Sequence, residues 1–344
     1  MSEIPRGAIR FNTDSNKPEL WVGSQWAEFQ LSTPNIGRGV DTEPGARGLF
    51  AGGRLSPSTS DRTEIDYINI SSTGDAQDFG DLLDARLDLA GCSSSTRGVF
   101  GGGYTNGNTI DFVTISSTGT AQDFGDLSGT FRGFLASCSS ATRGLWGGGT
   151  TPAGRVDTIE YVTISATGSA QDFGDLTVAR RQVSACSSPT RGVFFGGQNP
   201  SFPTAPGTIF NTIDYVTISS LGDAFDFGDM TQTSGQRSAL SNATRGVTGG
   251  GGQGGFINII EYITISTLGN AANFGDLTAA RGTLSALSSP TRGVFGGGYD
   301  GGPTFFNTID YITIQTQGDA VDFGDLLGNN KYRHGSCSNG HGGL

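Results

Sequence analysis

Arg-Gly-Val-Phe-Gly-Gly-Gly, residues 97–103, is the stretch of sequence that decides the fold, because variants of it recur along the chain. The copies begin at Arg47, Arg97, Arg143, Arg191, Arg245 and Arg292, with spacings of 50, 46, 48, 54 and 47 residues. A sequence that resembles itself at a period of about 20 to 50 residues indicates a repeat architecture. The chain is therefore predicted to be built from six similar units.

Each repeat contains four short candidate strands. The Arg-Gly-Val-Phe run is followed by a β-branched and aromatic run such as Ile-Asp-Tyr-Val-Thr-Ile at 213–218, which is typical of a half-buried strand. An Asp-Phe-Gly-Asp-Leu block or a close variant follows at 78–82, 123–127, 172–176, 226–230, 273–277 and 322–326. An arginine usually comes next, and then a run of small residues such as 184–188. Four strands per repeat and no sustained helical period predict an all-β fold, a six-bladed β-propeller.

The small-residue run is predicted to be the innermost strand of each blade. Equivalent positions in this run, five residues before each repeated arginine, hold Cys92, Cys138, Cys186, Leu240 and Leu287, and the C-terminal tail holds Cys337. The corresponding position before the first repeat is Thr42, in a segment with proline and glycine that is a poor strand. We therefore predict that residues 334–340 supply the innermost strand of the first blade, and that deleting about the last ten residues unfolds far more than the tail.

The same register bears on the four cysteines, which by number alone could form two disulfides or one zinc site. They occupy one equivalent position in four blades, and leucine occupies it in the other two. Equivalent positions in adjacent blades are expected to exceed the roughly 7 Å Cα separation that a disulfide allows. Buried free thiols are the prediction.

One acid per repeat lies in the third candidate strand, and an aromatic residue follows it. The pairs are Asp66–Tyr67, Asp111–Phe112, Glu160–Tyr161, Asp214–Tyr215, Glu261–Tyr262 and Asp310–Tyr311. Because the six repeated arginines are in register with these acids, we predict ion pairs or hydrogen bonds repeated around the ring. A ring of catalytic carboxylates is the alternative. Since active sites are asymmetric, a residue present in every blade is better explained as part of the blade.

Composition narrows the class of protein. Glycine is 57 of 344 residues, yet 35% of the residues are hydrophobic and 22 are phenylalanine, which indicates a folded, turn-rich chain. A net charge of −11 leaves no basic face for nucleic acid. The N-terminus lacks the pattern of a signal peptide, and no apolar run is long enough to cross a membrane, so no membrane insertion is expected.

Catalytic and metal-binding motifs are sparse. The two histidines, His334 and His341, lie in the tail, and no His/Cys cluster has the spacing of a zinc site. Asp-Phe-Gly also occurs in protein kinases, but the glycine-rich loop, strand lysine and catalytic loop of kinases are absent. Residues 75–81 contain spaced acids without a twelve-residue calcium loop. We expect no catalytic residue, no metal and no cofactor.

The first 36 residues do not belong to the repeat, and residues 37–46 are predicted to link them to the propeller at 47–344. Two of the three tryptophans lie in this N-terminal segment. A β-meander of this size cannot bury its aromatic residues by itself, so we predict that they contact a partner protein. The residues concerned are Phe11, Trp21, Trp26 and Phe29. Packing on the propeller's own surface is the alternative.

Two long connections are the other candidate binding elements. They span 197–210 and 299–306 and carry Phe202, Tyr299, Phe305 and Phe306. Variable loops on a rigid scaffold are where recognition is usually found, and aromatic side chains offer large contact surfaces. Local packing within the loops is the alternative for these four residues.

The repeats resemble the kelch pattern over residues 44–344. In one repeat the matching residues are Arg180 before the first strand, Gly196–Gly197 after the second, Tyr215 in the third and Phe227 in the fourth. Phenylalanine stands where kelch repeats usually have tryptophan. Six copies in register make the resemblance specific, and it implies a six-bladed propeller that binds other molecules.

The N-terminal segment resembles a motif of tailed-phage virion proteins. Gly-Ala-Ile-Arg-Phe-Asn-Thr-Asp at 7–14, followed by the tryptophans at 21 and 26, carries this resemblance, and the repeats look like those of marine, especially cyanobacterial, phages. It implies a virion component, such as a tail fibre, knob, spike or capsid decoration protein. The N-terminal segment would be anchored to capsid, tail or fibre proteins, and the propeller would bind a protein or a host-surface glycan. Binding of single copies and formation of a homo-oligomer both stay open.

Two other classes of protein are alternatives. A cellular kelch-type adaptor would have partners other than virion proteins. An enzyme of the galactose-oxidase class would need copper and histidine ligands, and the shortage of histidine argues against it.

Overall fold

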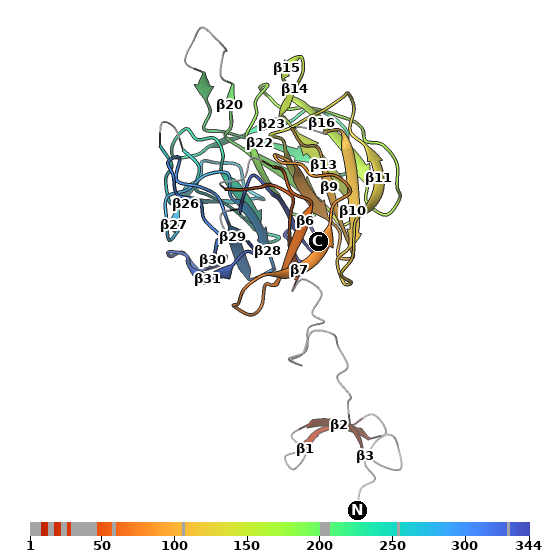
Figure 1. The fold of residues 1–344 in the computed structure, drawn as a ribbon. Coiled ribbons are helices and arrows are strands. Elements are labelled where there is room, and N and C mark those ends of the chain that lie inside the picture. The colour runs from red at the N-terminus through yellow and green to blue at the C-terminus, as the bar shows by residue number, and fades with distance from the viewer. Residues whose placement is uncertain are drawn as a thin grey trace, which may run out of the picture. The chain divides into compact units, whose positions relative to one another are not determined.

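The computed structural model describes residues 8–12, 17–21, 26–28, 47–56, 60–104, 107–199, 207–252, 255–328 and 331–344. All of the regular secondary structure in these ranges consists of β-strands. The chain divides into two compact units, Met1–Glu43 and Pro44–Leu344. Figure 1 shows the larger unit as a ring of sheets.

The N-terminal unit contains the β-meander expected from the sequence. Strands β1 (Ile9–Asn12), β2 (Lys17–Trp21) and β3 (Trp26–Glu28) form one antiparallel sheet in that order. Trp21 and Trp26 are partners in the β2–β3 register, and their ring centroids lie 5.4 Å apart. Both tryptophans remain half-buried within the structure.

The larger unit is a six-bladed β-propeller of four-stranded antiparallel sheets, as predicted (Figure 1). From the innermost strand outward, blade 1 contains β33 (Gly335–Ser338), β4 (Arg47–Ala51), β6 (Glu64–Asn69) and β7 (Gln77–Asp81). Blade 2 contains β8 (Ala90–Ser93), β9 (Arg97–Gly101), β10 (Thr109–Thr114) and β11 (Gln122–Asp126). Blade 3 contains β12 (Ala136–Ser139), β13 (Arg143–Gly147), β16 (Thr158–Thr163) and β17 (Gln171–Asp175).

The second half of the ring repeats this arrangement. Blade 4 contains β18 (Ser184–Ser187), β19 (Arg191–Phe195), β22 (Thr212–Thr217) and β23 (Phe225–Asp229). Blade 5 contains β24 (Ser238–Ser241), β25 (Arg245–Gly249), β26 (Ile259–Thr264) and β27 (Ala272–Asp276). Blade 6 contains β28 (Ser285–Ser288), β29 (Arg292–Gly296), β30 (Thr308–Thr313) and β31 (Val321–Asp325). Short two-stranded pairings are β14 (Thr150–Thr151) with β15 (Gly154–Arg155), β20 (Gln198–Asn199) with β21 (Thr208–Ile209), and β5 (Arg54–Leu55) with β32 (Lys331–Tyr332).

The C-terminal strand closes the ring, which confirms the prediction for residues 334–340. β33 pairs with β4 in antiparallel register, from Gly335 opposite Ala51 to Ser338 opposite Gly48. Blade 1 therefore combines the last strand of the chain with the first three strands of the repeat. Because both ends of the repeat region share one sheet, neither leaves an open edge at the centre of the ring.

The hydrophobic core lies between adjacent blades. One cluster joins Phe124 of blade 2 to the fully buried Trp146 of blade 3, and equivalent clusters occupy the other blade interfaces. The phenylalanine of each Asp-Phe-Gly-Asp block is buried in this way, as expected. Every blade has a β-bulge in the third strand, between the positions of Ile110 and Asp111. At this bulge the register between the third strand and the outermost strand shifts.

The cysteines are buried free thiols, as predicted. They pack against the glycine of the repeated Arg-Gly pair in the next blade. A Cβ atom on Gly144 would lie 2.5 Å from Cys92 Sγ, so only glycine allows the two blades this close approach. Burial raises the pKa of all four thiols, to about 12 for Cys186.

The repeated arginines do not pair with the third-strand acids, and this corrects the prediction. Arg97 stands opposite Thr114 in the β9–β10 register, whereas Asp111 stands opposite Phe100. An offset of three residues is about 10 Å, and because side chains alternate along a strand, an odd offset places the two groups on opposite faces. Arg97 instead lies over the Phe112 ring at 4.3 Å and donates a hydrogen bond to the Ile164 carbonyl of the next blade.

The acids pair with the cation that precedes each innermost strand. The buried pairs are Lys331–Asp66, Arg86–Asp111, Arg132–Glu160, Arg180–Asp214, Arg237–Glu261 and Arg281–Asp310. Blade 5 has Ser234 at the usual arginine position, and its cation comes three residues later from Arg237. A repeated ion pair is thus confirmed, with a different partner from the one expected.

Candidate functional site

The two ends of the propeller axis differ in how much their connections vary. At one end, which we call the turn face, seven residues always join the third and fourth strands: 70–76, 115–121, 164–170, 218–224, 265–271 and 314–320. At the other end, the loop face, the connections between second and third strands range from seven residues (102–108) to sixteen (196–211). Turns of equal length are sufficient to build six similar blades. The connections of unequal length therefore make the blades differ from one another at the loop face, where recognition is usually found.

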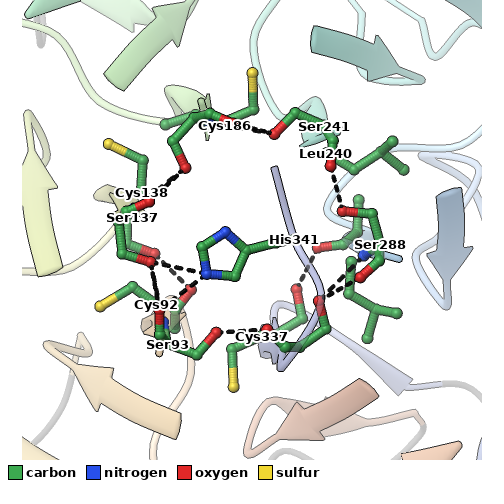
Figure 2. Close-up of a pocket in the computed structure, with 18 residues that line it drawn as sticks. Cys92, Ser93, Ser137, Cys138, Cys186, Leu240, Ser241, Ser288, Cys337 and His341 are labelled. Carbon is green, nitrogen blue, oxygen red and sulfur yellow. Dashed lines mark hydrogen bonds between the residues drawn. The ribbon is translucent and has the colours of Figure 1, made fainter. Parts of the chain in front are cut away.

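A ring of serines joins the innermost strands near the turn face. Each Oγ donates to the carbonyl of the equivalent serine in the preceding blade (Figure 2). The distances are 2.7 Å for Ser93 to Ser338, 2.9 Å for Ser139 to Ser93, 2.8 Å for Ser187 to Ser139, 2.7 Å for Ser241 to Ser187, 2.7 Å for Ser288 to Ser241 and 2.6 Å for Ser338 to Ser288. The strands are thereby tied together around the axis.

The C-terminal tail inserts His341 into the middle of this ring, as Figure 2 shows. The His341 Nε2 lies 2.9 Å from the Ser93 carbonyl, and the Gly343 N–H donates to Nδ1 at 3.0 Å. Nδ1 therefore carries no proton, and burial lowers the pKa of His341 to about 4. The surrounding cavity measures about 50 Å³, which is room for a few water molecules only. The axial cavity inside the serine ring is therefore too small for a larger ligand.

A second closed ring lies at the loop face, made of backbone hydrogen bonds. In each blade, the residue two positions before the innermost strand donates its N–H to the carbonyl of the equivalent residue in the preceding blade. The donor and acceptor pairs are Asp88 to Arg333 (2.9 Å), Phe134 to Asp88 (3.0 Å), Gln182 to Phe134 (2.8 Å), Gln236 to Gln182 (3.2 Å), Thr283 to Gln236 (3.0 Å) and Arg333 to Thr283 (3.0 Å). We call these six residues the axial ring.

All six residues of the axial ring have φ between 54° and 63°, and they are the only non-glycine residues with positive φ in the described ranges. A left-handed conformation costs an L-residue about 1–2 kcal/mol, and glycine would adopt it at a lower steric cost. All of the remaining described residues with positive φ are glycines. The axial ring therefore has side chains where glycine would cause less backbone strain. These side chains differ from blade to blade: Asp, Phe, Gln, Gln, Thr and Arg. Such strain is a recurrent feature of functional sites.

Charged and aromatic groups gather around one part of the axial ring. The Phe134 ring centroid lies 5.2 Å from Arg181 Cζ and 5.3 Å from Arg333 Cζ. Arg333 also pairs with Asp88 at 3.3 Å, and burial raises the pKa of Asp88 to about 7, against the lowering effect of Arg333. The exposed Tyr104 packs edge-on against Phe134 with centroids 5.4 Å apart.

Two of the three predicted binding residues of the 299–306 connection, Tyr299 and Phe305, belong to an aromatic group. Tyr299 and Phe305 stack with centroids 5.4 Å apart, and Tyr332 contacts both rings. Phe256 joins from the neighbouring blade at 5.0 Å from Tyr299. The Phe306 ring instead lies 5.6 Å from Arg281 Cζ, the cation of a buried ion pair. Tyr299 and Phe305 are half-buried on the loop face, and their role in binding stays a prediction.

The remaining predicted binding residues belong to the N-terminal sheet or to parts of the chain outside the described ranges. Phe202, Phe29 and the linker at 37–46 lie outside the described residues. Phe11 lies in β1, on the sheet that also carries Trp21 and Trp26. The structure brings Trp21 and Trp26 together, and it brings Tyr299 and Phe305 together.

The sequence reasoning missed the axial ring and the arginines beside it. The sequence did contain a signal for the axial ring. Four residues before the cysteine or leucine of each innermost strand, the type of residue changes in nearly every repeat, although the surrounding turn is regular. A second signal was the doubled arginine at 180–181, where only one arginine is needed for the buried ion pair.

The described residues contain no group of three or more His, Cys, Asp or Glu that could hold a metal ion. The first of the three acids in the 75–81 stretch, Asp75, takes part in packing between blades, because its Oδ1 accepts a hydrogen bond from the Asp325 N–H of the adjacent blade at 3.0 Å. Across these same ranges, no helix is long and apolar enough to cross a membrane.

Comparisons of the sequence with protein-family models and with curated proteins found no match to either.

Proposed function

We propose that this protein is a structural component of a phage virion, whose N-terminal unit docks on the particle and whose propeller binds a protein or a host-surface ligand through the loop face. The observation that carries the binding role is the contrast between the two ends of the axis. The turn face has connections of constant length and a buried histidine at its axis, whereas variable connections and strained, non-identical side chains occupy the loop face.

The docking role rests on the N-terminal motif at 7–14 and on the division of the chain into two compact units. Trp21 and Trp26 are only half-buried in a three-stranded sheet, which leaves aromatic surface for a partner. The proposed partners are capsid, tail or fibre proteins. The propeller is proposed to act by binding and not by catalysis.

The test compares the intact protein with a form lacking residues 1–36, in binding to phage particles and to host cells. The proposal expects truncation to abolish binding to particles and to leave binding to cells or to a target protein intact. Absence of binding to particles by the intact protein would overturn the virion role and favour a cellular kelch-type adaptor.

Two exposed apolar side chains allow the binding face to be tested with matched variants. Tyr104, 47% exposed, lies on the loop face, and Leu221, 57% exposed, lies in a turn of the turn face. Tyr104→Ser should weaken binding by the propeller, and Leu221→Ser should leave it unchanged. Equal effects of the two substitutions would show that the loop face has no special part in recognition.

A further inference from the structure

We propose that the arginine cluster at the loop face, formed by Arg181 and Arg333 on the Phe134 ring and by the neighbouring Arg155, binds the carboxylate of an acidic saccharide. This inference deepens the proposed binding function of the loop face and rests on it. Arg333 and Phe134 belong to the axial ring, and Arg181 is the residue before Gln182 of that ring. Arg155 lies in the β14–β15 hairpin.

The cluster holds more positive than negative charge, although the whole chain has a net charge of −11. Arg54 pairs with Asp61, and Arg333 pairs with Asp88. Within the described residues, Arg155 and Arg181 form no ion pair with an acid, so two positive charges remain in excess. An excess of cationic charge beside the axis attracts an anion.

The fold holds these arginines together at an energetic cost. Burial lowers the pKa of Arg181, and the nearby charges of Arg155 and Arg333 lower it further. The Nε atoms of all three arginines are buried without a hydrogen-bond partner within the described structure. Buried donors without partners and like charges in proximity both destabilise a fold. A bound anion would relieve the repulsion, which is what a preorganised binding site provides.

The chemistry of the arginines favours a carboxylate. A guanidinium group presents a planar fork of donors that matches the two oxygens of a carboxylate. Stacking on the Phe134 ring restricts the orientation of Arg181 and Arg333, so less freedom is lost when a ligand binds.

A saccharide is favoured by the surface next to the cluster. The exposed Tyr104 ring contacts Phe134 on one side and Phe131 on the other, with centroids 5.4 and 5.8 Å apart. Phe131 lines a pocket of about 400 Å³, a size suited to a small ligand. The other lining residues include hydroxyl groups from Ser128, Thr130, Thr151 and Thr158. Aromatic faces beside hydroxyl groups suit a sugar ring, which is apolar on its faces and polar at its edge.

The test is calorimetric titration of the full-length protein with an oligogalacturonate, with a neutral oligosaccharide of the same length and with a glutamate-rich peptide. Arg181→Gln removes a charge that makes no ion pair, and Arg62→Gln removes the same charge from the half-buried Arg62–Glu64 pair outside the cluster. Binding of the oligogalacturonate should weaken by about tenfold or more in the first variant and stay unchanged in the second. It should also weaken as salt is added. Unfolding midpoints of both variants establish that they are folded.

Each other outcome overturns the inference in a distinct way. Preference for the peptide rejects the saccharide, equal binding of the neutral oligosaccharide rejects the carboxylate, and an unchanged affinity of Arg181→Gln rejects the cluster. If cells are bound through Tyr104 but no acidic saccharide is bound, the inference fails and the proposed function stands. If the saccharide binds while neither particles nor cells are bound, the proposed function fails and the site stands.

Discussion

Removal of the closing strand should unfold the whole propeller. The perturbation is deletion of residues 333–344, which removes β33 and the tail behind it and keeps Lys331, the partner of the buried Asp66. Without β33, blade 1 has no innermost strand, and the facing surfaces of blades 6 and 2 lose their neighbour. Because the core lies between blades, damage at one interface exposes the cores of both adjoining blades.

The size of the effect follows from the contacts of the strand. β33 pairs with β4 over four residues, Ser336 and Ser338 donate to blade 6 carbonyls, and Ser93 of blade 2 donates to the Ser338 carbonyl. At about 1 kcal/mol for each hydrogen bond, and with burial of Cys337 added, the loss is on the order of 8 kcal/mol. That is comparable with the roughly 5–15 kcal/mol that stabilises a typical domain.

Urea unfolding followed by the fluorescence of the buried Trp146 measures this loss, in a background where the two N-terminal tryptophans are phenylalanine. Deletion of 341–344 alone is the matched control, since it removes His341 and leaves β33 in place. The long deletion should give no cooperative transition, and the short one should lower the midpoint modestly. A long deletion that unfolds cooperatively with the midpoint of the intact protein would refute the reasoning.

Three further predictions concern buried polar groups. Arg237→Leu leaves the Glu261 carboxylate buried without its cation and should cost about 3–5 kcal/mol in urea unfolding, most of it recovered by adding Glu261→Leu; equal losses in the single and double variants would contradict this. Since burial raises the thiol pKa values, to about 12 for Cys186, the four cysteines should react with a thiol reagent such as Ellman's only after unfolding, and rapid labelling of the native protein would be the contrary result. The pKa of His341 is about 4 in the folded state and about 6.5 in the unfolded chain, so its contribution is fully present above pH 6.5 and is lost as pH falls through 4. That contribution is at most about 3 kcal/mol, and unfolding measured between pH 7 and pH 4 should show a steeper fall for the native protein than for His341→Gln.

The sequence by itself determined the repeat, the number of blades, the order of four strands in each blade and the closing strand. These features are local or periodic. Strand patterns alternate with a period of two, and glycine and small residues indicate the turns and the inner strands. Because six copies can be aligned, a strand that is absent from one copy can be identified. The cysteines could be interpreted for the same reason, because the register placed Cys92 and Leu240 at one equivalent position.

Only the tertiary structure decided which charged residues meet and where the unlike side chains gather. Arg97 and Arg86 are both conspicuous in the sequence, but strand pairing and side-chain alternation direct the first onto an aromatic ring and the second onto Asp111. The arginine cluster depends on Phe134, Arg181 and Arg333, which are separated by up to 199 residues. The closed ring brings them together at its axis, because blades 1, 3 and 4 all face that axis. No local sequence pattern indicates this proximity.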